Sequence, residues 1–210
     1  MFVAPTAIRS PRVAVAPATT GSAAPNMLDA GDTSGMVART FGFIDLCAFT
    51  AYTDRRGPHA AAFALTSFRS MVRDLADRRG VRVAKWMGDG VMIVGVEPMA
   101  TVAMVVDAVG RIDDPELSAS AGVTTGPALL FDGGDYTGRL VNLAARLCDM
   151  AGPGEVLAEG ETLRCVPSWI TVQPYRTVSV RGLGRIDTVR RLSAPASAFA
   201  RSVRLTGPAA

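Results

Sequence analysis

Hydrophobic and polar residues alternate along the chain with two different periods, which together predict a mixture of strands and helices. Residues 40–46 form a short apolar run typical of a buried strand. Residues 58–79 carry apolar side chains at helical spacing, with Pro58 suited to the first turn and Gly80 directly after the last. The domain is therefore predicted to begin with a strand and a long helix.

A tight hairpin is predicted to follow this helix. The apolar runs 81–86 and 91–96 flank the sequence Gly88-Asp89-Gly90, and aspartate between glycines is typical of a turn that joins two antiparallel strands. The hairpin would place an acidic residue between two apolar strands.

The second half of the chain continues the alternation. We predict helices at 99–109 and 138–150, and strands at 117–125, 127–131, 170–181 and 186–192. The order strand, helix, hairpin, helix, strand predicts an α+β fold, a ferredoxin-like βαββαβ sandwich with extra C-terminal strands. Such a fold hosts many functions, so the function has to be argued from particular side chains.

Both ends of the chain lack any such period. Residues 1–37 are rich in Ala, Pro, Thr, Gly and Ser, and residues 194–210 are similar. We predict flexible tails at 1–37 and 194–210 around one folded domain at 38–193, a length that suits a single hydrophobic core.

Composition and charge exclude several classes of protein. The net charge of +3 comes from scattered basic residues, which argues against a nucleic-acid-binding face. Three cysteines without paired spacing and a single histidine argue against a disulfide framework and a Cys/His metal site. The most apolar region, 91–109, is interrupted by Glu97, Pro98 and Asp107 and is too broken to span a bilayer. We expect a soluble, cytoplasmic protein.

Two aspartates stand among apolar residues. Asp45 lies in the predicted strand, where a carboxylate is costly to bury unless a cation, a metal or hydrogen bonds satisfy it. Asp45 could instead turn to solvent at the strand end, and Asp89 could be a plain turn residue. The predicted fold sets the hairpin beside the first strand, however, which would bring the two carboxylates together as oxygen ligands for a divalent cation.

Four other polar residues are candidate functional residues. Lys85 is the only lysine among 22 basic residues and lies in the strand that leads to Asp89, although a single occurrence can be chance. Asn142 and Arg146 are four positions apart and share one face of the predicted helix, which could be an ordinary polar face. Asp135 follows two glycines and could be an ordinary turn residue.

These residues lie in three stretches that resemble motifs of class III adenylate and guanylate cyclases. The stretches read FGFIDLCAFTAYT, VAKWMGDGVMIV and GVTTGPALLFDGGDYTGRLVNLAARL. The resemblance covers residues 38–193 and implies a palm-type cyclase homology domain. Three motifs in order are more specific than any one alone.

The resemblance implies an adenylate cyclase that converts ATP to 3′,5′-cyclic AMP and pyrophosphate at a homodimer interface. It implies that Asp45, Asp89 and the backbone carbonyl of Leu46 bind two Mg²⁺ or Mn²⁺ ions. The resemblance also implies that Lys85 and Asp135 recognise the adenine base and that Asn142 orients the ribose. It implies that Arg146 stabilises charge on the α-phosphate and that Arg181 contacts the terminal phosphates.

Two positions depart from the family pattern. Ala48 stands where glycine is usual, which would be unfavourable if the backbone there requires a positive φ. Trp86 replaces a smaller residue and could crowd the purine pocket.

Two alternatives remain open. The chain could be a degenerate cyclase domain that binds a nucleotide, or only dimerises, without turnover. A diguanylate cyclase is disfavoured, because Gly133-Gly134-Asp135 is followed by Tyr136 and Thr137 instead of Glu-Phe.

Overall fold

The computed structural model describes residues 35–131, 134–180, 182–199 and 202–206. Residues 35–131 begin with β1 (Met36–Cys47), α1 (Phe49–Arg79), β2 (Arg82–Met87), β3 (Gly90–Gly95), α2 (Pro98–Gly110) and β4 (Ser118–Leu130). After them come β5 (Tyr136–Thr137), α3 (Arg139–Met150), β6 (Val156–Glu159), the 3₁₀ helix η1 (Gly160–Cys165), β7 (Thr171–Pro174), β8 (Val178–Val180), β9 (Gly184–Ile186), β10 (Arg190–Ser193) and the 3₁₀ helix η2 (Ala196–Ala198). Residues 1–34 of the predicted tail 1–37 lie outside the described residues, whereas Met36 and Val37 belong to β1 instead of a tail.

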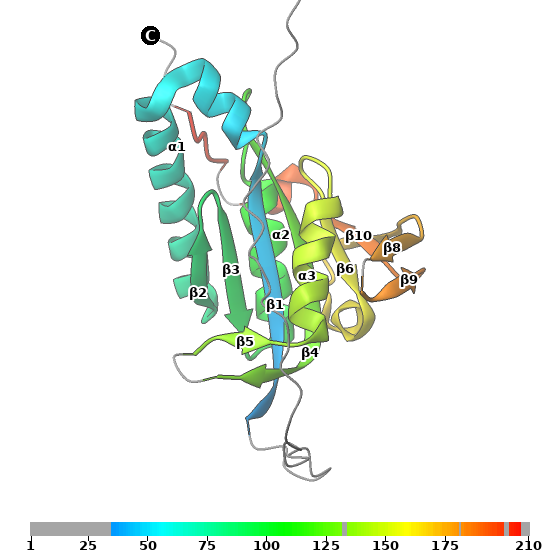
Figure 1. Cartoon of the computed structure of the whole chain (residues 1–210). Helices are drawn as coiled ribbons and strands as arrows, with labels where there is room; N and C mark the ends of the chain where they lie inside the picture. The colour runs from blue at the N-terminus through cyan, green and yellow to red at the C-terminus, as the bar shows by residue number, and fades with distance from the viewer. Residues whose placement is uncertain (1–34, 132–133, 181, 200–201, 207–210) are drawn as a thin grey trace, which may run out of the picture. The chain divides into compact units, whose positions relative to one another are not determined.

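The main sheet has the strand order β2-β3-β1-β4-β6-β10-β7, with β5 paired to β4 (Figure 1). Its first four strands have the antiparallel pairing and the order of a ferredoxin-like sandwich, so the predicted fold class is confirmed. The parallel strand β6 and the strands after it extend the sheet beyond β4.

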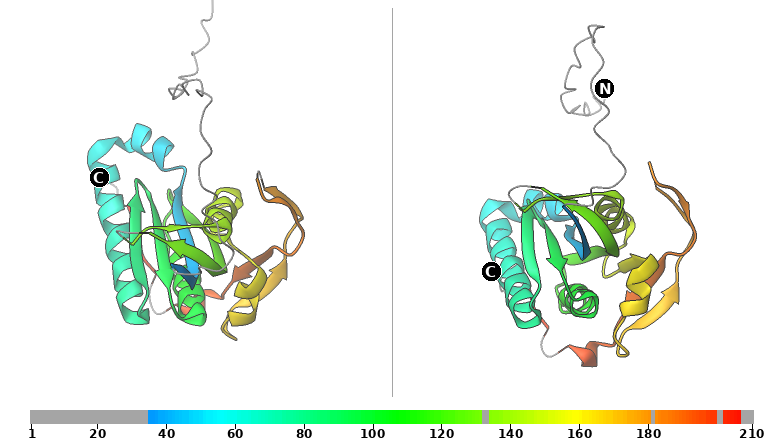
Figure 2. Two further views of the ribbon diagram at one scale, coloured as in Figure 1. Left: turned by 60° about the horizontal axis from the view of Figure 1, so that its bottom comes forward. Right: turned by 90° about the horizontal axis from the view of Figure 1, so that it is seen from below.

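The helices cover both faces of the sheet. One core cluster joins α1 and α2 to β1 and β3, with Ile44, Phe68 and Met104 among its fully buried side chains. On the opposite face α3 packs over β1 and β4 through residues such as Phe41 and Ala144. Figure 2 shows α2 and α3 on the two sides of the sheet. Within the described residues, no helix is both long and apolar enough to cross a membrane.

The first helix differs from its prediction. The expected helix 58–79 is present, but α1 begins nine residues earlier, at Phe49. Gly57 has φ 81° and ψ 170°, so two helical segments meet there at a kink. Pro58 follows this glycine and begins the second segment, which is why the sequence signal for a helix start fell at that point.

The strand β4 is one continuous element where two strands around Gly126 were predicted. Gly126 has φ 150°, and a Cβ there would lie 2.3 Å from Leu140 Cδ1, so close packing against α3 explains the glycine. β1 and β4 pair from Cys47 opposite Ser118 to Met36 opposite Leu129. Because β3 pairs with β1 only between Thr40 and Asp45, the two long strands continue past the sheet as a two-stranded arm.

The C-terminal half departs most from prediction. β6 and η1 were not predicted, and the expected strand 170–181 is divided into β7 and β8, with β8 in a separate two-stranded sheet with β9. A flexible tail was also expected after Ser193.

Residues 202–206 of this expected tail instead pack on the domain. Val203 pairs with Ile112, and Leu205 is fully buried. The Asp114 carboxylate accepts hydrogen bonds from Leu205 N at 2.9 Å, Thr206 N at 2.7 Å and Thr206 Oγ1 at 2.7 Å. These bonds join positions about 90 residues apart and have no local sequence pattern.

Candidate active site

The two aspartates singled out in the sequence lie side by side at one end of the sheet. Asp45 is near the end of β1, directly opposite Gly90, the first residue of β3. Asp89 precedes Gly90 in the turn between β2 and β3. A Cβ on Gly90 would lie 2.6 Å from Asp45 Oδ1, so the absent side chain leaves the space that the carboxylate occupies.

The electrostatics of this pair favour a bound cation. The pKa of Asp45 is raised from 3.8 to about 6, first because neighbouring protein reduces its hydration and then because the Asp89 and Asp149 carboxylates repel its charge. Within the described residues, no lysine or arginine forms an ion pair with Asp45 or Asp89. Two neighbouring carboxylates without a protein cation fit a hard divalent metal ion.

The described residues offer few further side chains as metal ligands. The described part of the chain has no cluster of three or more His, Cys, Asp or Glu side chains that could hold a metal. The Leu46 side chain is 2% exposed and belongs to the core, so this residue could contribute only its backbone carbonyl. Remaining positions around a metal would have to be filled by water or phosphate oxygens.

Lys85 and Asp135 meet across the sheet although they are far apart in sequence. Lys85 Nζ lies 3.5 Å from Asp135 Oδ2, and the two side chains are 55% and 67% exposed. A register shift between Val83 and Lys85 marks a β-bulge in β2, a feature that commonly redirects a side chain. The pair is therefore accessible to a ligand.

Arg82 holds the loop that carries Asp135. Its Nη2 donates to Gly134 O at 2.9 Å, and its guanidinium lies 6.0 Å from the ring centre of Tyr136. The contacts fix the hairpin on both sides of Asp135, so the geometry of the Lys85–Asp135 pair depends on Arg82.

Asn142 and Arg146 project from the exposed face of α3. Together with Ala145, Gly182 and Leu183 they line a pocket of about 420 Å³. Arg146 Nη1 lies 3.1 Å from Asp149 Oδ2, so one side of the guanidinium is already paired. Arg181 lies outside the described residues.

The structure thus forms three separate groups within one chain: Asp45 with Asp89, Lys85 with Asp135, and Asn142 with Arg146. Among the described residues, no hydrogen bond or ion pair joins one group to another.

The architecture of the domain matches solved structures. The adenylyl cyclase CyaB from P. aeruginosa superposes with a TM-score of 0.68 at 24% identity, over 76% of this chain and 95% of that one. The guanylyl cyclase Cya2 superposes with a TM-score of 0.68 at 19% identity, over 80% and 97%. No protein-family model matches the chain.

Two curated relatives are similar to this chain in sequence. An uncharacterized protein of Mycobacterium tuberculosis is 40% identical over 144 residues, 66% of this chain and 37% of the relative. An adenylate cyclase of Glutamicibacter nicotianae is 30% identical over 162 residues, 76% of this chain and 40% of the relative. The chain is a class III nucleotidyl cyclase homology domain. It spans about two fifths of the length of these relatives.

The first departure of this cyclase domain from the family pattern concerns Trp86. The ring of Trp86 packs against α1, and its crowding of the purine pocket stays a prediction. It makes an edge contact with Phe68 at 6.4 Å and lies 5.2 Å from the guanidinium carbons of both Arg69 and Arg73. Ala84, two residues before Trp86, packs on the other face of the sheet, which is the face that carries α3.

The second departure is Ala48, which has φ 57° and ψ 27° at the start of α1. Among the described residues it is the only non-glycine residue with a positive φ. The left-handed conformation costs an L-residue about 1–2 kcal/mol, so the position favours the glycine that the family pattern has there.

We expect Ala48→Gly to raise the free energy of unfolding of the cyclase domain by about 1 kcal/mol, because strain in the folded state exceeds the extra entropy of glycine in the unfolded chain. Urea denaturation measures the change. Ala62→Gly, at an exposed site within α1, is the matched control and should lower stability by about 1 kcal/mol. Equal destabilisation by both substitutions would show that Ala48 is unstrained.

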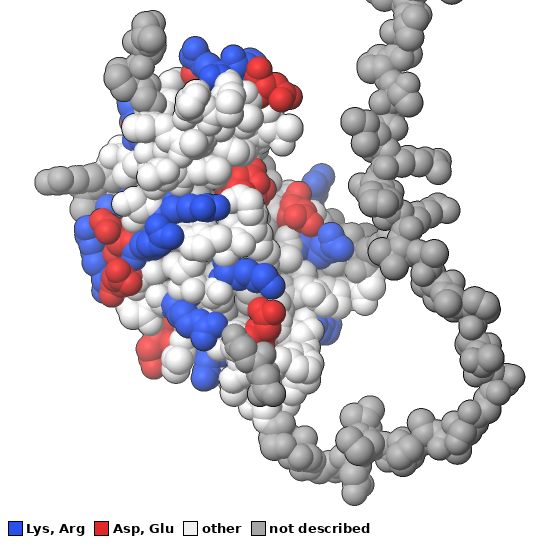
Figure 3. All heavy atoms as spheres, turned by 60° about the vertical axis from the view of Figure 1, so that its left-hand side comes forward, with Lys and Arg blue, Asp and Glu red and all other residues white. Residues whose placement is uncertain are grey.

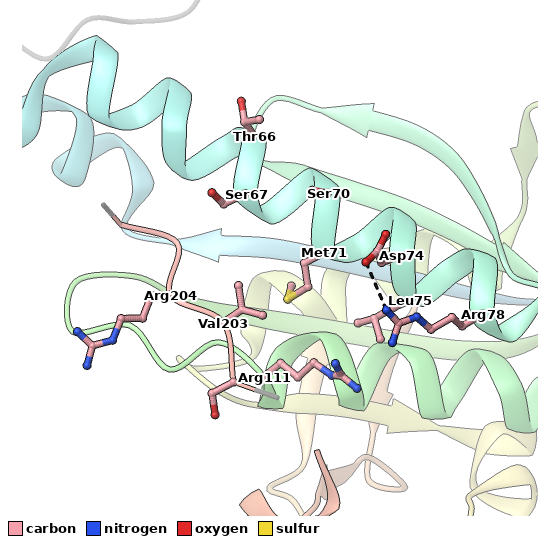
Figure 4. Close-up of a pocket in the computed structure, with 11 residues that line it drawn as sticks. Thr66, Ser67, Ser70, Met71, Asp74, Leu75, Arg78, Arg111, Val203 and Arg204 are labelled. Atoms are coloured by element: carbon pink, nitrogen blue, oxygen red, sulfur yellow. Dashed lines mark hydrogen bonds and ion pairs between the residues drawn. The ribbon is translucent and has the colours of Figure 1, made fainter. Parts of the chain in front are cut away.

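Other surfaces of the domain are less informative about function. A pocket of about 850 Å³ lies between α1 and the C-terminal segment, with Met71, Leu75 and Val203 beside the charged Asp74 and Arg78 (Figure 4). It contains none of the motif residues, so pocket size alone would not identify the active site. On the face that carries α1, basic and acidic side chains are interspersed (Figure 3).

Sequence reasoning missed four residues of the site. Asp149 could have been found, because it is three positions after Arg146 on the same helix face. Gly90 could have been assigned from its place opposite Asp45 in the predicted hairpin. No local sequence pattern indicates Arg69 or Arg82, because each donates a hydrogen bond to a loop carbonyl far along the chain, 19 and 52 residues away respectively.

Proposed function

We propose that the chain is an adenylate cyclase domain that converts ATP to 3′,5′-cyclic AMP and pyrophosphate at a homodimer interface with two divalent metal ions. The observation that carries the proposal is the contact of Lys85 with Asp135 in a domain whose Asp45 and Asp89 carboxylates also lie together. The relative from Glutamicibacter nicotianae, which is named an adenylate cyclase, supports it.

Asp45 and Asp89 would hold the metal ions, with the carbonyl of Leu46 as a further ligand. The Asp45 carboxylate lies against Gly90, and neither aspartate has a lysine or arginine partner among the described residues, which fits this role. Bound Mg²⁺ or Mn²⁺ would lower the pKa of the ribose 3′-hydroxyl and neutralise charge on the triphosphate.

Lys85 and Asp135 would recognise the adenine base. The lysine ammonium can donate a hydrogen bond to a ring nitrogen, and the aspartate carboxylate can accept one from the exocyclic amine. Guanine has a carbonyl where adenine has this amine, so a carboxylate placed there disfavours GTP. The likeness of the fold does not decide the base, because the solved neighbours include both adenylyl and guanylyl cyclases.

Asn142 and Arg146 would act on the ribose and the α-phosphate. Asn142 would orient the ribose so that its 3′-oxygen attacks the α-phosphorus, forming one P–O bond as the bond to the β-phosphate breaks and pyrophosphate leaves. Arg146 would stabilise the negative charge that builds on the α-phosphate, as positioned cations do in phosphoryl transfer. A role for Arg181 at the terminal phosphates remains a prediction.

A homodimer would complete the site. In one chain the metal-binding pair has no polar contact with Asn142 or Arg146 among the described residues, so these groups would be brought together from two chains. Exposed apolar side chains on the arm and its hairpin, Met36, Leu130 and Phe131, offer a surface that a second copy would cover. A twofold dimer would form two equivalent sites.

We expect a kcat/KM for ATP about 10- to 100-fold above that for GTP, because a mismatched polar pair costs about 1–3 kcal/mol. The measurement is product formation from each nucleotide with Mg²⁺ or Mn²⁺. Asp135→Ala should reduce the ratio, and Asp77→Ala, an exposed aspartate on α1, should leave it unchanged. Similar kcat/KM values for ATP and GTP would contradict the base assignment, and no product from either would favour a degenerate nucleotide-binding domain.

A further inference from the structure

A side chain from the long helix α1 reaches the turn that carries Asp89. Arg69 Nη2 donates a hydrogen bond to Gly88 O at 3.0 Å. The guanidinium carbon of Arg69 also lies 5.2 Å from the ring centre of Trp86, two residues before this glycine. Arg69 thus contacts both the turn and the strand that leads into it.

The turn itself explains why this hydrogen bond matters. Met87 pairs with Gly90, so Gly88 and Asp89 form a two-residue loop. Gly88 has φ 66°, whereas Asp89 is absent from the described non-glycine residues with positive φ, which is the pattern of a type II′ turn. Because the carbonyl of Gly88 belongs to the same peptide plane as the nitrogen of Asp89, a bond to that oxygen restrains the direction of the Asp89 side chain.

Arg69 is itself held in place. Its guanidinium stacks on Trp86, whose ring makes an edge contact with Phe68 and stacks with Arg73 on the same helix. A stacked, planar guanidinium loses less freedom when it donates a hydrogen bond than an unrestrained side chain does. Phe68, Arg69 and Trp86 therefore connect α1 to the β2–β3 turn, and the hydrogen bond to the turn itself comes from Arg69.

We propose that Arg69 is a positioning residue for metal binding: through the Gly88 carbonyl it fixes the turn so that the Asp89 carboxylate faces Asp45. The inference rests on the proposed role of these carboxylates. Arg73 provides an internal comparison, because it stacks on Trp86 at the same 5.2 Å but forms no hydrogen bond with the turn among the described residues.

The test compares Arg69→Ala, Arg69→Lys and Arg73→Ala in the full chain, with Mn²⁺ alone as the probe. Free Mn²⁺ is measured by electron paramagnetic resonance during titration without nucleotide. Arg69→Ala should weaken Mn²⁺ binding about tenfold, the effect typical of residues that orient metal ligands. Arg69→Lys, which keeps a donor, should recover part of the loss, and Arg73→Ala should bind Mn²⁺ as the wild type does.

Amide hydrogen exchange in the metal-free protein gives a second readout. Peptides that cover residues 87–91 should exchange faster in Arg69→Ala, whereas Arg73→Ala should match the wild type there. Equal effects of Arg69→Ala and Arg73→Ala in both measurements would show that Arg69 has only a packing role, which would overturn the proposal. A wild-type protein that binds no Mn²⁺ would also overturn it. A wild type that binds Mn²⁺ but does not cyclise ATP would refute the proposed function and leave the role of Arg69 intact.

Discussion

Asp45→Ala is expected to reduce cyclisation of ATP at least about a thousandfold while the domain remains folded, because a metal ion supplies several kcal/mol of transition-state stabilisation. Asp89→Ala should have the same effect. The measurement is cyclic AMP formation with saturating Mg²⁺, and circular dichroism verifies the fold. Asp77→Ala is the matched control, since Asp77 is an exposed aspartate outside the site.

The thermal stability of Asp45→Ala should hold or rise although its activity is lost. The pKa of Asp45 is raised from 3.8 to about 6 in the folded protein. The ionisable group therefore leaves stability unchanged below pH 3.8, lowers the free energy of unfolding increasingly between pH 3.8 and about 6, and lowers it by a constant amount above that. In the presence of a chelator, the thermal midpoint of Asp45→Ala should therefore equal or exceed that of the wild type at pH 7, and the difference should shrink towards pH 4. Normal turnover of either aspartate variant with Mg²⁺ would show that the metal assignment is wrong.

Mixing two inactive variants is expected to restore activity. Asp45→Ala damages the metal-binding half of a site, and Arg146→Ala damages the half that stabilises the α-phosphate. If the halves come from opposite chains, each mixed dimer has one intact site and one doubly damaged site. Random exchange makes about half of the dimers mixed, so about a quarter of the wild-type activity should return under twofold symmetry.

A second mixture is the control for this experiment. Asp45→Ala and Asp89→Ala affect the same half, so their mixed dimers contain no intact site and should stay inactive. Subunit exchange must be demonstrated, for example by co-expression with two different affinity tags. If exchange occurs and the first mixture stays as inactive as its components, the interfacial site and most of the residue roles proposed for it are wrong.

The pairing of the two aspartates could be predicted from sequence because it depends on local patterns. The hairpin motif and the strand–helix–hairpin order are encoded by neighbouring residues, and the ferredoxin-like topology then sets β3 beside β1. The close approach of Asp45 to Gly90 follows from that register.

Features that depend on distant contacts could not be predicted. The direction of Trp86 follows from the bulge at Val83–Lys85 and the packing of α1, neither of which has a local sequence signal. The packing of Leu205 depends on Asp114, nearly a hundred residues earlier. Gly126 was predicted to separate two strands, but it lies within β4, where the lack of a side chain leaves room for Leu140 on α3.

The continuity of β4 has a consequence for how two active sites would communicate. This strand passes Asp45 at Ser120 and runs on without interruption to Leu130, where it pairs with the hairpin that carries Asp135. In the proposed dimer, the Asp45 end would serve one site and the Asp135 end the other. Both sites of the proposed dimer would therefore be built on one continuous strand, so a displacement of β4 at one site would reach the other.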